Sequence, residues 1–243
     1  MKQTEFEIIS NTPLTESVFR LDLRGDTDGI APGQFVEIAL PGLFLRRPIS
    51  VYDRDAELLS LIIKRVGKGT DVLAGMKTGK LDILTGLGNG YDLSAAGEHP
   101  LLIGGGVGVP PLYLLARELL QNGVRPQAIL GFNTAAELFA REAFEALGVK
   151  TFVTTADGSL GIKGFVTDAM RTLSYTYFYA CGPVPMLRAL CAQSVTSGEL
   201  SLEARMGCGF GACMGCTVKT ADGPRRVCKE GPVFRKEALV WED

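Results

Sequence analysis

The hydrophobic residues of the first hundred positions are grouped in short runs, which predicts β-strands. Val, Ile, Phe and Leu partly alternate with polar residues within these runs, and Gly, Pro, Asp and Asn separate the runs at intervals of about 8–12 residues. This spacing is typical of an antiparallel barrel or sandwich. Only residues 69–79 resemble a short helix. The predicted strands are residues 6–10, 17–23, 33–40, 47–53 and 57–65.

From about residue 98 the pattern changes to strands that alternate with helices. The predicted strands are residues 101–104, 128–132, 150–155 and 175–182. The predicted helices are residues 110–121, 135–147, 167–171 and 183–192. Strands that alternate with helices of this length predict a parallel sheet built from βαβ units.

The sequence therefore predicts a multi-domain β plus α/β fold with three parts. An antiparallel β-barrel is expected over residues 1–97, a parallel-sheet α/β domain over 98–200, and a small cysteine-rich module over 201–243. A strand predicted over 201–205 leads into the cysteine-rich segment, and the last fifteen residues show no clear period.

Composition excludes several classes of protein. The 243 residues carry a formal net charge of −2, which removes the electrostatic case for nucleic-acid binding. No apolar run approaches the roughly 18 residues of a membrane span, and the first ten residues lack the apolar segment of a secretory signal. We expect a soluble, cytoplasmic protein. The single histidine, His99, argues against a Ser-His-Asp triad or a multi-histidine metal site, and we expect it to be structural.

Four of the six cysteines form the strongest chemical signal. Cys208, Cys213, Cys216 and Cys228 have the spacing C-x4-C-x2-C-x11-C, which matches the plant-type pattern for a 2Fe–2S cluster. Several glycines between Gly207 and Gly215 would let the loop fold around the cluster and direct amide groups at the sulfurs.

The alternative for these thiolates is a zinc site, which usually pairs two C-x2–4-C knuckles, whereas this segment contains one C-x2-C. Cys181 and Cys191 lie outside the spacing, and taken alone each is best interpreted as a small buried hydrophobic residue.

A glycine-rich loop follows the first strand of the α/β region. It contains Gly104, Gly105, Gly106 and Gly108 and enters a helix that begins with two prolines. The loop does not fit the G-x-G-x-x-G template, but a helix N-terminus behind a glycine loop favours a pyrophosphate. We expect a Cβ at Gly106 or Gly108 to obstruct that approach. Taken alone, the loop could also be a tight packing turn.

Two further segments add to this picture. Cys181, Gly182 and Pro183 end a later strand, and ligands of open α/β sheets bind along the edge where such strands end. In the barrel region, the segment Arg47-Pro48-Ile49-Ser50 together with Gly69 and Thr70 would suit a flavin pyrophosphate. By itself the Arg-Pro-Ile-Ser segment is usually a strand with a solvated arginine.

Taken in order, these segments resemble the ferredoxin-reductase-like flavoproteins. The order is RPIS, GKGT, GNGY, GGGVGVPP, CGP and the terminal cysteine loop, and the resemblance covers essentially the whole chain. It is closer still to the electron-transfer subunits of NAD-dependent class 1B dihydroorotate dehydrogenases. Two features depart from the wider reductase pattern: Ile49 stands where many members have tyrosine, and the terminal aromatic residue that shields the flavin is absent.

The resemblance implies FAD on the barrel, NAD(H) on the α/β domain and a 2Fe–2S cluster at the C-terminus. It implies flavin contacts from two strands and pyrophosphate contacts from Gly69 and Thr70. The implied flavin contacts are Arg47, Pro48, Ile49, Ser50, Ile63, Lys64 and Arg65.

The three cofactors form one chemical series. NADH gives up two electrons as a hydride, an iron–sulfur cluster accepts one electron, and a flavin can do both, so no acid–base residue is required of the protein. The resemblance supplies the partner, an FMN-containing dihydroorotate dehydrogenase catalytic subunit in a heterotetramer of two plus two, which serves pyrimidine biosynthesis. NAD is expected rather than NADP, because the segment after residue 132 offers no Lys or Arg before Arg141.

Two alternatives remain open. One is a related subunit of a sulfite reductase, sulfhydrogenase or NADH-dependent transhydrogenase complex. The other is a zinc-binding adaptor that keeps the folds without redox activity; a visible spectrum with flavin and cluster bands would exclude it.

Overall fold

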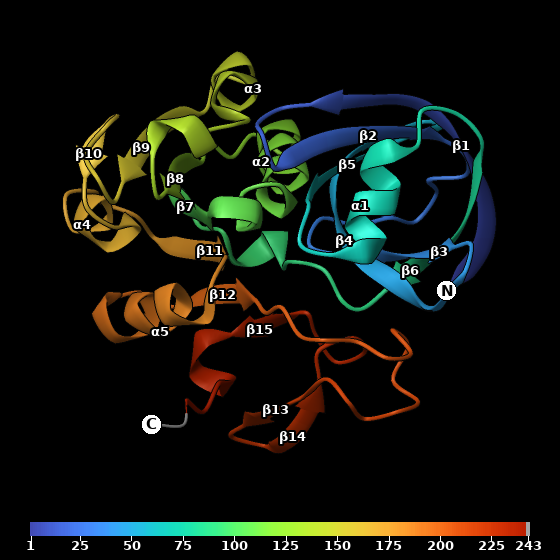
Figure 1. Cartoon of the computed structure of the whole chain (residues 1–243). Coiled ribbons are helices and arrows are strands. Elements are labelled where there is room, and N and C mark those ends of the chain that lie inside the picture. The colour runs from blue at the N-terminus through green and yellow to red at the C-terminus, as the bar shows by residue number, and fades with distance from the viewer. Residues whose placement is uncertain (242–243) are drawn as a thin grey trace.

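Six antiparallel strands close into a barrel in the N-terminal part of the chain. The structure is a computed structural model and describes residues 1–241 (Figure 1). Neighbouring strands around the barrel follow the order β1-β2-β5-β4-β3-β6. The strands are β1 (Lys2–Pro13), β2 (Val18–Arg24), β3 (Phe35–Leu40), β4 (Leu43–Asp55), β5 (Leu58–Lys64) and β6 (Lys80–Leu87). The sequence pattern did not predict β6, which pairs with both β1 and β3 and so closes the barrel.

Alternating apolar residues fill the inside of the barrel, as expected for strands with one buried face. Leu21 and Leu23 of β2 and Leu59 and Leu61 of β5 are fully buried there. The short helix α1 (Lys68–Gly75) lies against the barrel, and it ends four residues before the predicted end. The barrel prediction is thus confirmed.

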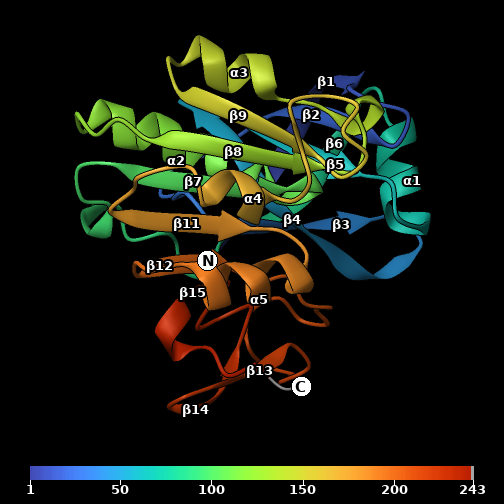
Figure 2. The same cartoon turned by 90° about the vertical axis from the view of Figure 1, so that its left-hand side faces the viewer.

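The second part is a mostly parallel sheet with helices on both faces (Figure 2). The strand order is β10-β9-β8-β7-β11-β12-β15. The strands are β7 (Pro100–Gly105), β8 (Gln127–Phe132), β9 (Lys150–Thr155), β10 (Ile162–Lys163), β11 (Tyr177–Cys181), β12 (Gly198–Ser201) and β15 (Val233–Arg235). The helices are α2 (Pro111–Gln121), α3 (Arg141–Ala146), α4 (Val166–Met170) and α5 (Val184–Gln193). Most buried side chains of α2 join one core cluster with Phe144 of α3, Leu114 of α2 joins the barrel core, and buried side chains of α4 and α5 join a third cluster.

Three details differ from the sequence prediction. The helix predicted over 135–147 is two pieces, a 3-10 turn at Ala135–Glu137 and α3, because Ala140 between them has a left-handed φ of 63°. The strand predicted over 201–205 lies earlier, at β12, where it pairs in parallel with β11. The segment without a clear period contains β15, which pairs antiparallel with β12.

The C-terminal module is small and irregular. It contains a two-stranded hairpin, β13 (Thr217–Thr220) and β14 (Gly223–Arg226), and the chain then returns through β15 to the edge of the large sheet. Figure 1 shows this module below the barrel and the sheet.

The barrel and the sheet are joined by charged and aromatic contacts between β4 and α2. Arg117 of α2 pairs with Asp53 at 3.0 Å, and Arg54 pairs with Glu118 at 3.1 Å. The rings of Tyr52 and Tyr113 stack with their centroids 4.5 Å apart. None of the helices in residues 1–241 is long and apolar enough to cross a membrane.

The buried carboxyl of Glu199, on β12 near the edge of the sheet, should make the stability of the fold depend on pH. Its side chain on β12 is 6% exposed and accepts a hydrogen bond of 3.0 Å from the Asp92 N–H. Burial raises the pKa of Glu199 from 4.5 to about 7. Between these pH values the folded protein binds more protons than the unfolded chain, so this carboxyl makes the fold less stable as the pH rises.

We expect Glu199→Gln to relieve this penalty, so that its melting temperature exceeds that of the parent more near pH 7 than near pH 4.5. The pKa difference corresponds to about 3 kcal/mol. Glu142→Gln, at an exposed position on α3, is the control and should show no such dependence. Equal gains at both pH values would contradict the assignment.

Candidate functional site

A cavity of about 660 Å³ opens along the edge where the parallel strands end. Its walls include residues at or just after the carboxyl ends of four strands: Gly105 and Gly106 at β7, Gly131, Phe132 and Asn133 at β8, Thr154 and Ala156 at β9, and Gly182 and Pro183 after β11. The strand order reverses between β7 and β11, because β8 and β9 lie on one side of β7 and β12 lies beyond β11. Open α/β sheets bind their ligands at such a reversal.

The four glycines predicted for the nucleotide loop divide into two kinds. Gly105 and Gly106 line the cavity, and no described atom lies within 4 Å of a Cβ built on Gly106. Gly104 and Gly108 instead pack against the chain itself. A Cβ on Gly108 would overlap the Cys181 carbonyl, so a larger residue there would disturb packing before it met a nucleotide.

The loop after β11 contributes two of its three predicted residues to the cavity. Gly182 and Pro183 line it, whereas the Cys181 side chain is 1% exposed and burial raises the pKa of its thiol. The Thr154 hydroxyl also lies at this wall, fully buried and without a hydrogen-bond partner among the described residues.

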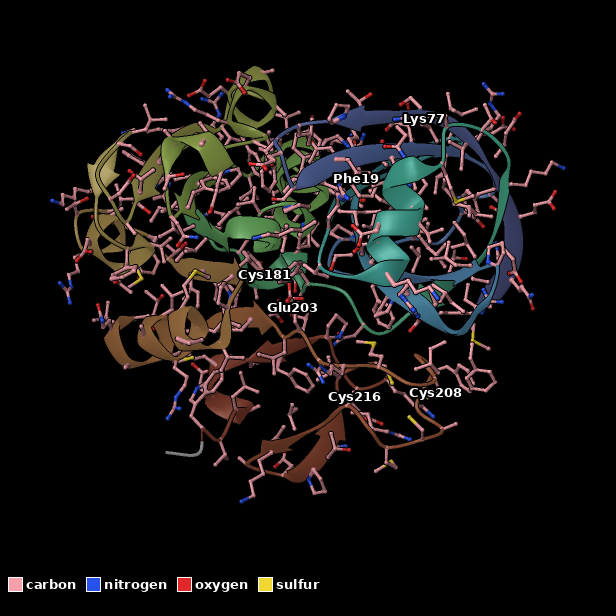
Figure 3. The ribbon with its side chains drawn as sticks, viewed as in Figure 1. Phe19, Lys77, Cys181, Glu203, Cys208 and Cys216 are labelled. Atoms are coloured by element: carbon pink, nitrogen blue, oxygen red, sulfur yellow. The ribbon has the colours of Figure 1, made fainter. Side chains whose placement is uncertain are left out.

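Three charged residues, Lys64, Glu137 and Glu203, line the cavity from outside the sheet strands. Lys64, at the end of β5, brings the barrel to the cavity. Glu203, which the sequence prediction missed, follows β12 and lies close to Cys181 in Figure 3. Because β12 ends at Ser201, Glu203 lies just after a strand end at the ligand-binding edge of the sheet. The sequence prediction placed this strand at 201–205, so Glu203 was taken for a strand residue and not for a site residue.

The predicted pyrophosphate site brings Arg47 of β4 and Gly69 of α1 into contact. A Cβ on Gly69 would overlap the Arg47 guanidinium, which therefore lies directly over the first turn of the helix. The Thr70 hydroxyl donates to the Gly67 carbonyl at 2.9 Å and accepts from the Val66 N–H at 2.8 Å, which shapes the preceding loop. An arginine over a helix N-terminus fits a phosphate group.

The other predicted flavin contacts differ in what they can offer. Ile63 is 2% exposed and belongs to the barrel core, so only its backbone can face a cofactor. Arg65 pairs with Asp71 at 2.9 Å beside α1. Pro48, Ile49 and Ser50 are half-buried along β4.

The four predicted ligand cysteines are arranged as two pairs. Cys208 accepts hydrogen bonds from the Ala212 N–H at 3.2 Å and the Cys213 N–H at 3.5 Å, and Cys216 accepts from the Cys228 N–H at 3.4 Å. Side-chain hydrogen bonds join Cys208 to Cys213 and Cys216 to Cys228. The pKa of Cys208 is lowered, because backbone hydrogen bonds to the sulfur outweigh the opposing effect of burial.

This pairing fits a two-iron cluster better than a zinc ion. A two-iron cluster needs two thiolates on each iron, whereas structural zinc takes four ligands around one centre. Cys213 is exposed and the second pair is buried, so the site lies between the surface and the interior.

Neighbouring residues hold the cysteine loop in place. Arg226 donates to the Gly211 carbonyl at 2.6 Å and forms an ion pair with Glu230. Gly209, with a φ of +74°, lies so close to Glu37 of β3 that a Cβ would overlap the carboxylate. The loop therefore packs directly on the barrel.

Glu37 is a second residue that sequence reasoning missed. It is 1% exposed, and its Oε1 has no hydrogen-bond partner among the described residues. Burial raises the pKa of Glu37 to about 7. A lone glutamate in the buried strand pattern of β3 was the signal that could have found it.

Comparisons with known proteins agree with this geometry. Residues 203–240 match the family model described as the iron-sulfur cluster binding domain of dihydroorotate dehydrogenase B, and residues 102–192 match the oxidoreductase NAD-binding domain. Proteins named dihydroorotate dehydrogenase B (NAD(+)), electron transfer subunit, are 41% identical in Geobacillus sp. strain WCH70 and in Fusobacterium nucleatum. The alignments cover 99% of both chains for the first and 96% of this chain and 97% of the relative for the second.

Solved structures extend the comparison. The NADH-dependent reduced ferredoxin-NADP oxidoreductase matches with a TM-score of 0.89 and 30% identity over 97% of this chain and 90% of its own. A ferredoxin NADP+ reductase from Neisseria gonorrhoeae, solved with FAD and NADP, matches with a TM-score of 0.67 over 77% of this chain and 88% of its own. Its 18% identity supports the fold alone.

Barrel, nucleotide-binding sheet and cysteine module together define a ferredoxin-reductase-like flavoprotein with an iron–sulfur domain. The full-length relatives show that the chain belongs to the family of electron-transfer subunits of dihydroorotate dehydrogenase B. The cofactor set of FAD, NAD(H) and a 2Fe–2S cluster follows from these domains.

Arg47→Ala tests the pyrophosphate site. Removing the guanidinium over α1 should weaken FAD binding by about 1.5–3 kcal/mol, the contribution of a charge-assisted hydrogen bond. FAD content and affinity after gel filtration measure the effect. Arg24→Ala, an exposed barrel arginine paired with Glu7, is the control. Full FAD occupancy with unchanged affinity in Arg47→Ala would exclude this site.

Gly106→Ala tests the nucleotide loop. The added methyl group would enter the cavity, so NADH affinity should fall about tenfold, equivalent to about 1.4 kcal/mol, while bound FAD remains. Stopped-flow flavin reduction at varied NADH concentration measures it. Because Gly106 has a φ of +53°, Gly123→Ala is the control for backbone strain, since Gly123 has a φ of +78° and an equally open Cβ position among the described atoms. Equal kinetics in both variants would place the nucleotide elsewhere.

Proposed function

We propose that this chain is the electron-transfer subunit of an NAD-dependent dihydroorotate dehydrogenase. It passes electrons between NAD(H) and the FMN of a catalytic subunit, through FAD and a 2Fe–2S cluster, in pyrimidine biosynthesis. The observation that carries the proposal is the position of the barrel. Lys64 of the barrel lines the nucleotide cavity, and Glu37 of the same barrel packs on the cysteine loop.

The protein supplies binding and orientation in this proposal. When bound, the flavin exchanges a hydride with the nicotinamide and single electrons with the cluster. Arg47 and the N-terminus of α1 hold the pyrophosphate of FAD. Gly105 and Gly106 admit the pyrophosphate of NADH, and the Arg117–Asp53 ion pair keeps the sheet fixed against the barrel.

Selection of NAD over NADP is assigned to Glu137. This residue lines the cavity just after β8, and its carboxylate accepts a 3.0 Å hydrogen bond from the Asn133 side chain. A carboxylate at this place can bind the ribose hydroxyls and repels a 2′-phosphate. Lys64, the cation among the described lining residues, lies at the barrel end of the cavity.

The partner is an FMN-containing catalytic subunit in a heterotetramer of two plus two. Electrons must leave near the exposed Cys213, and two exposed apolar residues of the same loop, Phe210 and Met214, are 45% and 52% exposed. Grouped apolar side chains on a surface favour a protein interface.

A cytoplasmic location is proposed because all six cysteines lack disulfides and thiolate ligands persist in a reducing compartment.

One observation favours a second candidate. The NADH-dependent reduced ferredoxin-NADP oxidoreductase is similar over nearly the full length, so a subunit of a transhydrogenase-type complex shares this architecture. The 41% identity to the dihydroorotate dehydrogenase B subunits exceeds the 30% identity to that oxidoreductase, and this supports the first candidate.

Cys213→Ser tests the function. Loss of a soft thiolate ligand should destroy or destabilise the cluster, while FAD stays on the barrel. NADH should still reduce the flavin, and a small artificial acceptor should still take its electrons. Oxidation of dihydroorotate with NAD by the assembled complex should fail. Cys191→Ser, outside the ligand spacing, is the control and should keep both activities.

Iron and flavin content and complex assembly are measured in each variant. If assembled, cluster-free Cys213→Ser still oxidised dihydroorotate with NAD at the parent rate, the cluster would not be the exit path. If the parent complex reduced another acceptor but never oxidised dihydroorotate, the second candidate would replace the first.

A further inference from the structure

The loop Gly88–Tyr91 has no part in the cofactor sites described above. It follows β6 and leads from the barrel toward the sheet. Its sequence, GNGY, stood out in the chain, yet none of its residues lines the nucleotide cavity. Within the loop, Asn89 contacts the segment Glu230–Val233, more than 140 residues further along the chain.

Asn89 makes most of these contacts. Its backbone N–H donates to the Gly231 carbonyl at 2.6 Å. Its side-chain amide donates to the carbonyls of Val233 at 2.8 Å and Glu230 at 3.2 Å, and its side-chain oxygen accepts from the Val233 N–H at 3.0 Å. Asn89 thus forms hydrogen bonds with backbone groups at both ends of the segment Glu230–Val233.

The shape of the loop supports this contact. Gly88 has a φ of +68°, and a Cβ there would lie 2.6 Å from Pro232. The backbone of the loop therefore lies directly against the segment that Asn89 holds, and a side chain at Gly88 would push the two apart.

The segment held by Asn89 is connected to the proposed cluster site in two ways. Cys228 precedes Glu230 by two residues in the chain. The Glu230 carboxylate pairs with Arg226, which donates to the carbonyl of Gly211 inside the cysteine loop. From Val233 onward, β15 pairs with β12 at the edge of the sheet.

We propose that Asn89 is a positioning residue that fixes the cysteine module on the barrel and so sets the distance between flavin and cluster. This rests on the proposed function. Electron transfer slows steeply as donor and acceptor move apart, so a small shift of the module changes the rate without changing either cofactor. Asn89 touches neither cofactor site and acts through Glu230 and Arg226.

Asn89→Ala tests the proposal in the full chain with both cofactors bound. The variant loses the three side-chain hydrogen bonds and keeps the backbone one. Anaerobic stopped-flow and rapid-freeze EPR follow flavin reduction by NADH and then cluster reduction by the flavin. We expect the first rate to equal that of the parent and the second to fall severalfold, at parent FAD and iron content.

Hydrogen exchange gives a readout independent of electron transfer. The Val233 amide loses its acceptor in Asn89→Ala and should exchange faster than in the parent. Asn122→Ala, after α2 and far from the module in sequence, is the control and should change neither rate nor exchange. If Asn89→Ala is purified with less than full iron, the same rates are measured in Asn89→Asp, which keeps the acceptor for Val233 and loses both amide donors.

A parent rate of cluster reduction in the fully loaded variant would overturn the positioning role. Faster exchange at Val233 with unchanged cluster reduction would overturn it as well, because the contact would then be structural only. If the flavin of the parent fails to reduce the cluster, the proposed function falls instead, so the two failures are distinguishable.

Discussion

The barrel must touch both the nucleotide cavity and the cysteine loop, and the rest of the structure depends on this constraint. Electrons that enter as a pair and leave singly require one flavin within reach of both partners. On the sheet side, the Arg117–Asp53 pair and the Tyr52–Tyr113 stack hold α2 against β4. On the other side, Gly209 packs on Glu37.

Close backbone approach recurs at the two nucleotide sites and at the contact between the barrel and the C-terminal segment. Gly108 packs on the loop after β11, Gly69 lies under the Arg47 guanidinium, and Gly88 lies against Pro232. A side chain at any of these positions would separate two elements that the sites need together. The glycine clusters of the sequence therefore mark contacts within the chain as much as contacts with cofactors: of the four glycines in the nucleotide loop, Gly105 and Gly106 line the cavity.

The sequence predicted those features of the fold and the site that depend on residues close together in the chain. The barrel strands, the βαβ alternation and the cysteine spacing could be read because apolar periodicity and ligand spacing lie within short segments. β6 and β15 could not, since the apolar positions of β6 do not alternate strictly and β15 is three residues long, so pairing with distant strands defines both. Glu37 and Glu203 were missed for the same reason, because the residues they lie against in the sites are distant from them in sequence.

The most direct test of the central claim is an anaerobic titration of the purified protein with NADH, followed by visible absorption and EPR with iron and zinc analysis. The account predicts bound FAD and iron, loss of the flavin absorption, and an EPR signal from a reduced 2Fe–2S cluster that grows with NADH. Reduction of the flavin without any cluster signal in iron-loaded protein, or zinc in place of iron, would contradict it.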